Sequence, residues 1–215
     1  MSSNLSVVKA TVRGMAEARS ANSKGEIRRE KVLEAAASQF VQYGYAAASV
    51  RAIADEAGIV PSSLYYYFAS KEDLLVAVHE EGLARIHAAV TQSLEGMEDP
   101  WKRLETACVA HLEKLLEGGV IFKAVMRELP RVYNEEALNR IRLTRDAYET
   151  IFARLLDDLI LPRGTDRHDL RLMLLGSLNW SFTWYQPGRS TPAELARQFL
   201  GYLRIRLDID GQSER

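Results

Sequence analysis

The chain has 215 residues, of which 47% are hydrophobic and 27% are charged, and its formal net charge at pH 7 is −1. This composition is typical of an ordinary globular protein with one or two cores. The single cysteine, Cys108, excludes an internal disulfide and a cysteine-based zinc site.

Neither a signal peptide nor a membrane span is expected. Residues 1–21 lack the apolar core of a signal peptide. The most apolar stretch, residues 172–185, is interrupted by small polar residues and is too short to cross a bilayer. We therefore expect a cytoplasmic protein without a membrane partner.

The N-terminal part changes character near residue 25. Residues 1–24 are small and polar without a sustained period, and they predict a flexible arm. From Ile27 onward, apolar residues recur at three- and four-residue steps, which predicts a first helix that Gly44 ends. Residues 1–71 carry nine basic and six acidic side chains, whereas residues 72–215 carry nineteen basic and twenty-three acidic ones. The excess of positive charge is modest, and a solvated surface would also account for it.

Two short helices are predicted next. Ser49 is a good cap for a helix over residues 50–57, and Gly58 allows a sharp turn after it. Pro61 suits the first position of the following helix. Two short helices joined by a glycine turn are typical of a helix-turn-helix.

The rest of the chain also has a helical pattern, and no segment alternates like a strand. Ser70 and Asp73 resemble a capping box that opens a long helix over 71–94. Further helices are predicted over residues 100–117, 120–129, 134–160, 166–185 and 192–208. The expected fold is all-α with about nine helices. The expected divisions are an arm over 1–24, a helix-turn-helix domain over 25–72 and a helical C-terminal domain over 73–215.

Three consecutive tyrosines stand in the second helix of the predicted helix-turn-helix. Leu64 and Phe68 are one helical turn apart and share an inward face, so Tyr65, Tyr66 and Tyr67 cover the outward arc. Tyrosine rings and hydroxyls suit the thymine methyl groups and phosphate oxygens of the DNA major groove. The alternative, above all for Tyr67, is that a ring packs on neighbouring helices.

These residues carry a family resemblance. The run "ASVRAIADEAGIVPSSLYYYFASKEDLL", Ala48–Leu75, together with the preceding "AAASQFVQYGY", resembles the DNA-binding signature of the TetR family of bacterial transcriptional repressors. The resemblance implies a homodimer that binds a palindromic operator in double-stranded DNA. It also implies an N-terminal three-helix DNA-binding domain, and a C-terminal helical domain that binds a small effector and dimerises through its last two helices.

The resemblance implies DNA contacts at particular positions of this chain. They are Arg28, Ser49, Arg51, Ser62, Ser63, Tyr65, Tyr66, Tyr67 and Lys71. Ser62, Ser63 and Tyr65 match positions that face base edges, whereas Tyr66, Tyr67 and Lys71 match those that bind the phosphate backbone. Arg28 lies at the start of the first helix, where a solvated side chain is the alternative.

Two positions depart from the family pattern. Val60 stands where the family commonly has a serine that caps the recognition helix, and a poor cap costs roughly 1 kcal/mol of helix stability. Ala48 replaces a frequent threonine before Ser49.

The C-terminal half predicts an interface and a pocket. Residues 172–185, "LMLLGSLNWSFTWY", are apolar on nearly every face, so a partner chain and the protein's own domain, or a ligand, must cover them. A surplus of large apolar side chains predicts an apolar effector pocket, with core packing as the alternative for each of them. The expected lining residues are Phe122, Met126, Phe152, Trp180 and Trp184.

The effector class follows from a second resemblance. The run "LGSLNWSFTWYQPGRSTPAELARQFL" is similar to members of the family that control fatty-acid and sterol breakdown and sense acyl-CoA thioesters. Such a ligand would require basic residues for its phosphates, and Arg127, Arg131 and Arg171 are candidates. A regulator of the same fold that senses planar hydrophobic drugs is the alternative.

An enzyme is not expected. The chain lacks the G-x-S-x-G, G-x-G-x-x-G, P-loop and H-E-x-x-H motifs, and its 4 histidines lack companions at metal-ligand spacing. The sequence therefore predicts no catalytic residue, no metal and no cofactor. A helical adaptor that does not bind DNA is a remote alternative, because it would leave the outward tyrosines unexplained.

Overall fold

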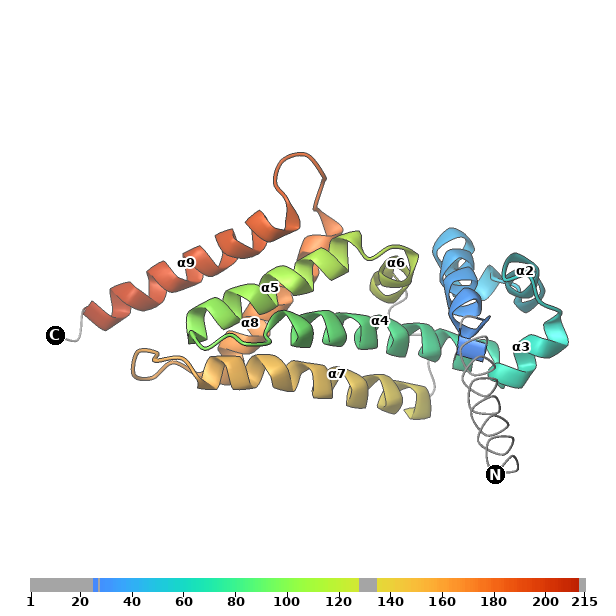
Figure 1. Ribbon diagram of the computed structural model, residues 1–215, viewed down its shortest axis with the longest axis horizontal. Coiled ribbons are helices and arrows are strands. Elements are labelled where there is room, and N and C mark those ends of the chain that lie inside the picture. Colours follow the sequence, from blue (N-terminus) through green and yellow to red (C-terminus); the bar gives the residue numbers. More distant parts are fainter. Residues whose placement is uncertain (1–24, 27, 128–134, 213–215) are drawn as a thin grey trace, which may run out of the picture. The chain divides into compact units, whose positions relative to one another are not determined.

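The computed structural model describes residues 25–26, 28–127 and 135–212, and every regular element in these ranges is a helix. The prediction of an all-α fold is confirmed. The described chain divides into two compact units, one ending at Leu75 and the other beginning at Val76 (Figure 1). The predicted arm, residues 1–24, lies outside the described residues.

The first unit consists of one longer helix, two short helices and the first turn of a fourth around a small core. A helix over residues 28–47 is followed by α2 (Val50–Glu56), α3 (Pro61–Tyr67) and the first turn of α4 (Lys71–Ser93). Gly44 has a φ of 77°, so the regular helix breaks there and one further helical turn continues to residue 47. The largest buried side chains of this unit are Leu33, Phe40, Ile53, Leu64, Phe68, Leu74 and Leu75.

The turn between α2 and α3 requires a glycine. Gly58 has a φ of 70°, in the left-handed region that side chains with a Cβ avoid. Its N–H donates to the Asp55 carbonyl at 3.1 Å, and the Ile59 N–H donates to the Ala54 carbonyl at 2.9 Å. These two bonds satisfy the last carbonyls of α2 and fix the direction in which α3 leaves the turn.

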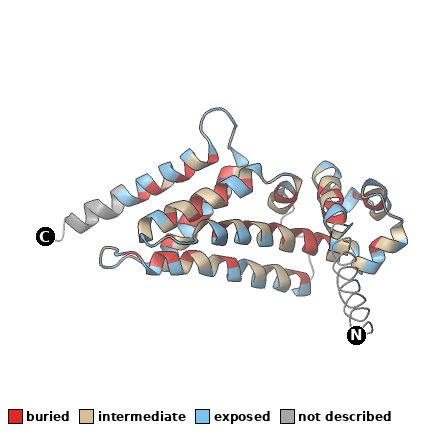
Figure 2. Ribbon diagram, in the orientation of Figure 1, coloured by how far each residue is buried: buried red, intermediate tan, exposed pale blue. Residues whose placement is uncertain are grey.

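The second unit is built from longer helices. Besides the rest of α4 it contains α5 (Pro100–Glu117), α6 (Val120–Arg127), α7 (Glu135–Asp157), α8 (Arg167–Trp180), the 3₁₀ turn η2 (Ser181–Thr183) and α9 (Pro192–Gln212). Helix α5 packs against α7, α8 and α9, so it forms the centre of the unit (Figure 1). Buried residues occupy the facing sides of these helices, while the outer sides are exposed (Figure 2).

Caps and apolar periodicity explain the bounds of the central helices. Helix α5 begins and ends at the predicted residues, because the Asp99 side chain accepts a hydrogen bond from the Lys102 N–H at 2.7 Å and Pro100 follows the cap. Helix α8 ends earlier than expected, at Trp180, where the chain tightens into η2.

No helix among the described residues is both long enough and apolar enough to cross a membrane.

A glycine brings α4 and α6 unusually close together. A Cβ on Gly82 would lie 2.9 Å from Cγ2 of Val125 and 3.4 Å from Cγ2 of Ile121. The first distance is shorter than a normal contact between carbon atoms, so a larger residue would push the two helices apart.

Candidate nucleic-acid interface and effector cavity

The outward face of α3 is polar and aromatic. The side chains of Tyr65 and Tyr66 are 55% and 85% exposed, whereas the side chain of Leu64, on the inward face of the same helix, is fully buried. Ser62 is exposed on the same helix and Ser63 is half-buried. The helix therefore presents hydroxyl groups and aromatic rings that can reach base edges and phosphates.

Tyr67 is placed differently from the other two tyrosines. It is half-buried, and its ring packs edge-on against Tyr66 with centroids 5.4 Å apart. The centroid of the Phe68 ring lies 6.4 Å from that of Tyr67. Tyr67 thus packs on rings of its own helix and its cap residue, and its expected phosphate contact stays a prediction.

The start of α2 adds polar groups to this unit. Ser49 is exposed at the N-terminal cap position, and its side chain forms no cap hydrogen bond there. Arg51, in the first turn of α2, and Arg28, in the first described helix, are also exposed. A guanidinium at a helix start can bind a phosphate or the edge of a guanine.

Lys71 makes internal contacts that differ from the expected phosphate contact. Its Nζ donates hydrogen bonds to the carbonyl oxygens of Tyr45, Ala46 and Ala48 at 2.8, 3.1 and 3.1 Å. It also lies 4.6 Å from the centroid of the Tyr45 ring. An ammonium group has three N–H donors, so these carbonyls use all of them. Lys71 thus caps the C-terminal end of the helix over 28–47, and its expected phosphate contact stays a prediction.

The missing cap of α3 leads to a stability prediction. Val60 occupies the cap position, is 61% exposed and provides no side-chain acceptor. We expect Val60→Ser to raise the unfolding free energy of the first unit by about 1 kcal/mol, because serine accepts from an N–H at the start of the helix. Thermal unfolding would measure the gain. Val60→Ala is the matched control, and an equal gain with alanine would contradict the capping explanation.

A second candidate site is an apolar cavity within the second unit. It has a volume of about 230 Å³ and is lined by residues of α4 to α8. Its apolar wall consists of Gly82, Leu83, Ile86, Leu115, Phe122, Val125, Met126 and Leu175. The polar groups on the wall are His111, Arg145, Tyr148, Glu149 and Asn179. Such a combination of apolar surface and few polar groups is typical of small-molecule sites.

Three of the polar residues form a hydrogen-bonded chain. The Nδ1 atom of His111 lies 2.6 Å from the Tyr148 hydroxyl, and its Nε2 atom lies 3.1 Å from Oδ1 of Asn179. Burial lowers the pKa of His111 to about 4, and burial also raises the pKa of Tyr148, so both are neutral at pH 7. The Phe152 ring packs edge-on against both His111 and Tyr148 and holds them in place.

Charged residues form a second group at the cavity. Glu149 lies 3.4 Å from Arg145 and 3.4 Å from Arg171, one oxygen facing each guanidinium. Arg145 also lies 3.1 Å from Asp146. Arg171 was expected from the sequence, and the structure places it beside this wall. The Arg131 residue and the Arg127 side chain lie outside the described part of the chain.

The expected ligand-binding residues separate into two groups. Phe122 and Met126 line the cavity, whereas Phe152 lies in the core and is fully buried. Trp180 and Trp184 are 67% and 47% exposed and do not line this cavity, so their expected role in ligand binding stays a prediction. Leu178 points into the core, and at about 100° per residue Trp180 falls on the opposite side of α8.

The hydrogen-bonded chain of His111, Tyr148 and Asn179 contains residues that the sequence did not single out. His111 stands in the buried stripe of α5 that includes Leu104, Cys108 and Leu115. A histidine in an apolar stripe was the available signal, but its partners are 37 and 68 residues away in the sequence. Among the described residues, no group of His, Cys, Asp and Glu is arranged to hold a metal ion.

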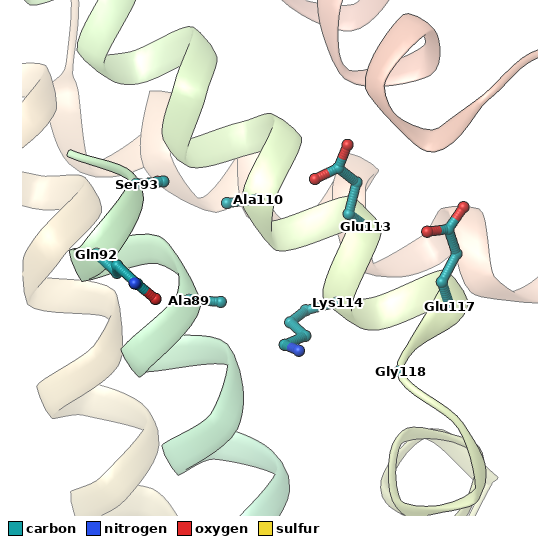
Figure 3. A pocket seen from close by; sticks show the side chains of 8 residues that line it. All are labelled: Ala89, Gln92, Ser93, Ala110, Glu113, Lys114, Glu117 and Gly118. Carbon is teal, nitrogen blue, oxygen red and sulfur yellow. The ribbon is translucent and has the colours of Figure 1, made fainter.

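A wider groove of about 500 Å³ lies between α4 and α5 (Figure 3). Its wall contains the small residues Ala89, Ser93 and Ala110, and Figure 3 shows Lys114 reaching from α5 toward α4. No large apolar side chain lines it. The smaller cavity is therefore the better site for a hydrophobic effector.

Comparisons with known proteins agree with both parts of this arrangement. Residues 32–78 match the family model of bacterial regulatory proteins of the tetR family. Residues 97–206 match the model of a tetracyclin repressor-like C-terminal domain. The first match covers the helix-turn-helix, and the second covers α5 to α8 and most of α9.

Individual relatives have similar lengths. The transcriptional repressor KstR2 of Mycobacterium tuberculosis is 28% identical over 179 residues, which cover 80% of this chain and 89% of KstR2. The TetR family regulator PfmR of Thermus thermophilus is 27% identical, with 78% of this chain and 93% of PfmR covered and a TM-score of 0.67. The crystal structure of PfiT, described as a superantigen, is 31% identical, with coverage of 80% and 94% and a TM-score of 0.70. The chain therefore belongs to the tetR family of bacterial regulatory proteins, and it is a DNA-binding regulator with a helix-turn-helix.

Proposed function

We propose that the protein is a transcriptional repressor that binds a palindromic operator as a homodimer and is released by a small hydrophobic effector. The exposed Tyr65 and Tyr66 on α3 are the observation that supports DNA contact most directly. The apolar cavity with its polar chain supports an effector. The proposed location is the cytoplasm, where the operator would be. We propose no enzymatic activity, since the relatives KstR2 and PfmR are regulators of transcription.

The primary test is a gel shift with the DNA upstream of the protein's own gene. We expect a discrete complex whose affinity falls steeply between about 50 and 200 mM salt, because neutralised phosphates release counterions. In a dimer, the two α3 helices, one from each protomer, would enter successive major grooves about 34 Å apart. An affinity that does not change with salt, or equal binding to random DNA, would count against a specific operator.

Arg51 and Tyr65 are proposed to read the operator sequence. We expect Arg51→Ala and Tyr65→Phe each to cost about 1–3 kcal/mol on the operator and much less on random DNA, since both side chains are placed to reach base edges. Competition gel shifts with both DNAs would measure this. Arg154→Ala, at an exposed arginine of α7, is the control and should change neither affinity. Equal losses on both DNAs would mean that the two residues only bind the backbone.

The proposed dimer surface combines α8 and α9. Large apolar side chains are exposed on these helices, namely Leu172, Met173, Trp180 and Tyr202. Such exposure is costly in a monomer and typical of an interface. Trp180, which does not line the cavity, therefore has a proposed role in dimerisation.

Trp180→Glu tests this surface. We expect the dimer dissociation constant to rise at least about tenfold, because a charge would replace an aromatic anchor. Analytical ultracentrifugation over a concentration series would measure it. Leu143→Glu is the matched control, because Leu143 is 71% exposed on α7, outside this surface. If both variants dimerise like the native protein, α8 does not form the interface.

Effector release is the last part of the proposal. Helix α4 contributes residues to both units and also lines the cavity, so a ligand that displaces α4 would oppose operator binding through one shared equilibrium. An acyl-CoA is the proposed effector class, supported by the apolar cavity and by Arg145 and Arg171 beside it.

Titration into the protein–operator complex would test the effector class. The panel should contain acyl-CoA esters, the corresponding free acids and planar cationic drugs. We expect the esters to dissociate the complex. If only the drugs do so, the protein is a multidrug-type regulator on the same fold.

A further inference from the structure

We propose that the α4–α8 cavity selects a small carbonyl-bearing body, such as the short acyl part of an acyl-CoA ester, and that the side-chain amide of Asn179 donates the hydrogen bond that selects it. The inference rests on the proposed effector function and specifies the size and the polar group of the ligand. It also assigns a binding role to Asn179, which no sequence motif indicated.

The size of the cavity limits the ligand. A dry apolar cavity of about 150 Å³ already holds benzene. The volume of about 230 Å³ found here therefore has room for a monocyclic or short branched body. At the packing density of protein interiors this corresponds to about ten non-hydrogen atoms. A steroid nucleus or a long acyl chain exceeds that space.

The donor and acceptor roles within the hydrogen-bonded chain of His111, Tyr148 and Asn179 decide which polar group remains for a ligand. Neutral imidazole has one N–H donor and one acceptor nitrogen. Since Nε2 of His111 faces Oδ1 of Asn179, Nε2 carries the proton and donates it. Nδ1 is then the acceptor, and the Tyr148 hydroxyl donates to it. The N–H of His111 and the hydroxyl hydrogen of Tyr148 are thus both used in hydrogen bonds among these three residues.

Among the three hydrogen-bonded residues His111, Tyr148 and Asn179, the amide nitrogen of Asn179 is the donor that remains for a ligand. Asn179 lines the cavity, and the hydrogen bond to His111 fixes the orientation of its amide. Within the described residues, no hydrogen bond engages its Nδ2 atom. A carbonyl oxygen is a pure acceptor and would satisfy this donor, while the apolar body of the ligand packs against Ile86, Val125 and Leu175. A hydrocarbon of the same shape would leave the donor unpaired, which is how such sites reject it.

A matched pair of probes tests the polar contact. Acetophenone and α-methylstyrene have nearly the same shape and differ by a carbonyl oxygen in place of a methylene carbon. We expect calorimetric titration of the full-length protein without DNA to show about tenfold tighter binding of acetophenone. Equal affinities would overturn the proposal.

Variants assign the contact to Asn179. In Asn179→Leu the two probes should bind equally, whereas Asn139→Leu, an exposed asparagine of α7, should keep the tenfold difference. Loss of the bond to His111 can destabilise Asn179→Leu, so infrared spectra of acetophenone bound to the native protein give an independent measurement. A lower carbonyl stretching frequency than in hexane is expected, and an unshifted band would overturn the proposal.

A steroid ketone tests the size limit. Androstenedione offers the same carbonyl group on a polycyclic body, and we expect it to bind at least about tenfold more weakly than acetophenone because it exceeds the cavity. Tighter binding of the steroid would overturn the size limit. All these titrations omit DNA, so their failure together with intact operator binding would refute this inference and leave the DNA-binding function standing.

Discussion

Lowering the pH from 6.5 to 4 is expected to destabilise the second unit by about 6 kcal/mol, because two of its histidines are buried without charge. Burial lowers the pKa of both His79 and His111 from 6.5 to about 4. Below pH 6.5 the unfolded chain binds protons at these positions and the folded chain does not. Stability therefore falls as the pH falls through this window and levels off below pH 4. Each pKa unit corresponds to about 1.4 kcal/mol, so each histidine contributes about 3 kcal/mol.

Urea unfolding at fixed protein concentration would measure this dependence. Replacing His111 by glutamine should remove about half of the pH dependence between pH 6.5 and 4, whatever it does to stability at pH 7. Asn139→Gln, at an exposed asparagine of α7, is the control, because it removes no titratable group and should leave the slope unchanged. A flat stability profile over this range would show that the buried histidines are protonated in the folded protein.

Lys71→Met is expected to lower the unfolding free energy of the first unit by about 2–3 kcal/mol. The substitution keeps the aliphatic length of the side chain and removes the charged donor that caps three carbonyls at a helix end. Hydrogen bonds from charged groups are individually stronger than neutral ones, and a cation is stabilised at the negative end of a helix. Thermal unfolding without DNA would record the loss.

DNA binding separates this role from a phosphate contact. Lys114→Met, at an exposed lysine of α5, is the matched control and should leave unfolding unchanged. If Lys71→Met unfolds like the native protein but weakens every DNA sequence alike, Lys71 is a phosphate contact after all. The structure favours the first outcome, since a carbonyl already accepts each of its three hydrogens.

The sequence predicted the helices well because their signals are local. Caps, glycines and the three-to-four spacing of apolar residues lie within a few positions of each other, as in α5, whose bounds matched the prediction. The outward tyrosines followed from the same spacing once Leu64 and Phe68 were assigned to the core. The family resemblance, confirmed by both family models, added the expected DNA contacts.

Contacts between distant segments were not predictable in the same way. Lys71 meets carbonyls 23 to 26 residues away, and no local pattern distinguishes a capping lysine from one that binds phosphate. Helix α8 is apolar on nearly every face, so its sequence alone does not say which side faces the core. Its register places Leu178 inside and Trp180 outside, and only the fold reveals this.

The close approach of α4 and α6 at Gly82 limits how this wall of the cavity can move. Carbon atoms at van der Waals distance repel steeply on compression but separate at little cost. Val125 and Ile121 occupy the space that a side chain at position 82 would need, so this wall resists compression. A ligand larger than the resting cavity can bind only by separating α4 from α6 and losing their contact, whereas the empty site is held close to its resting volume.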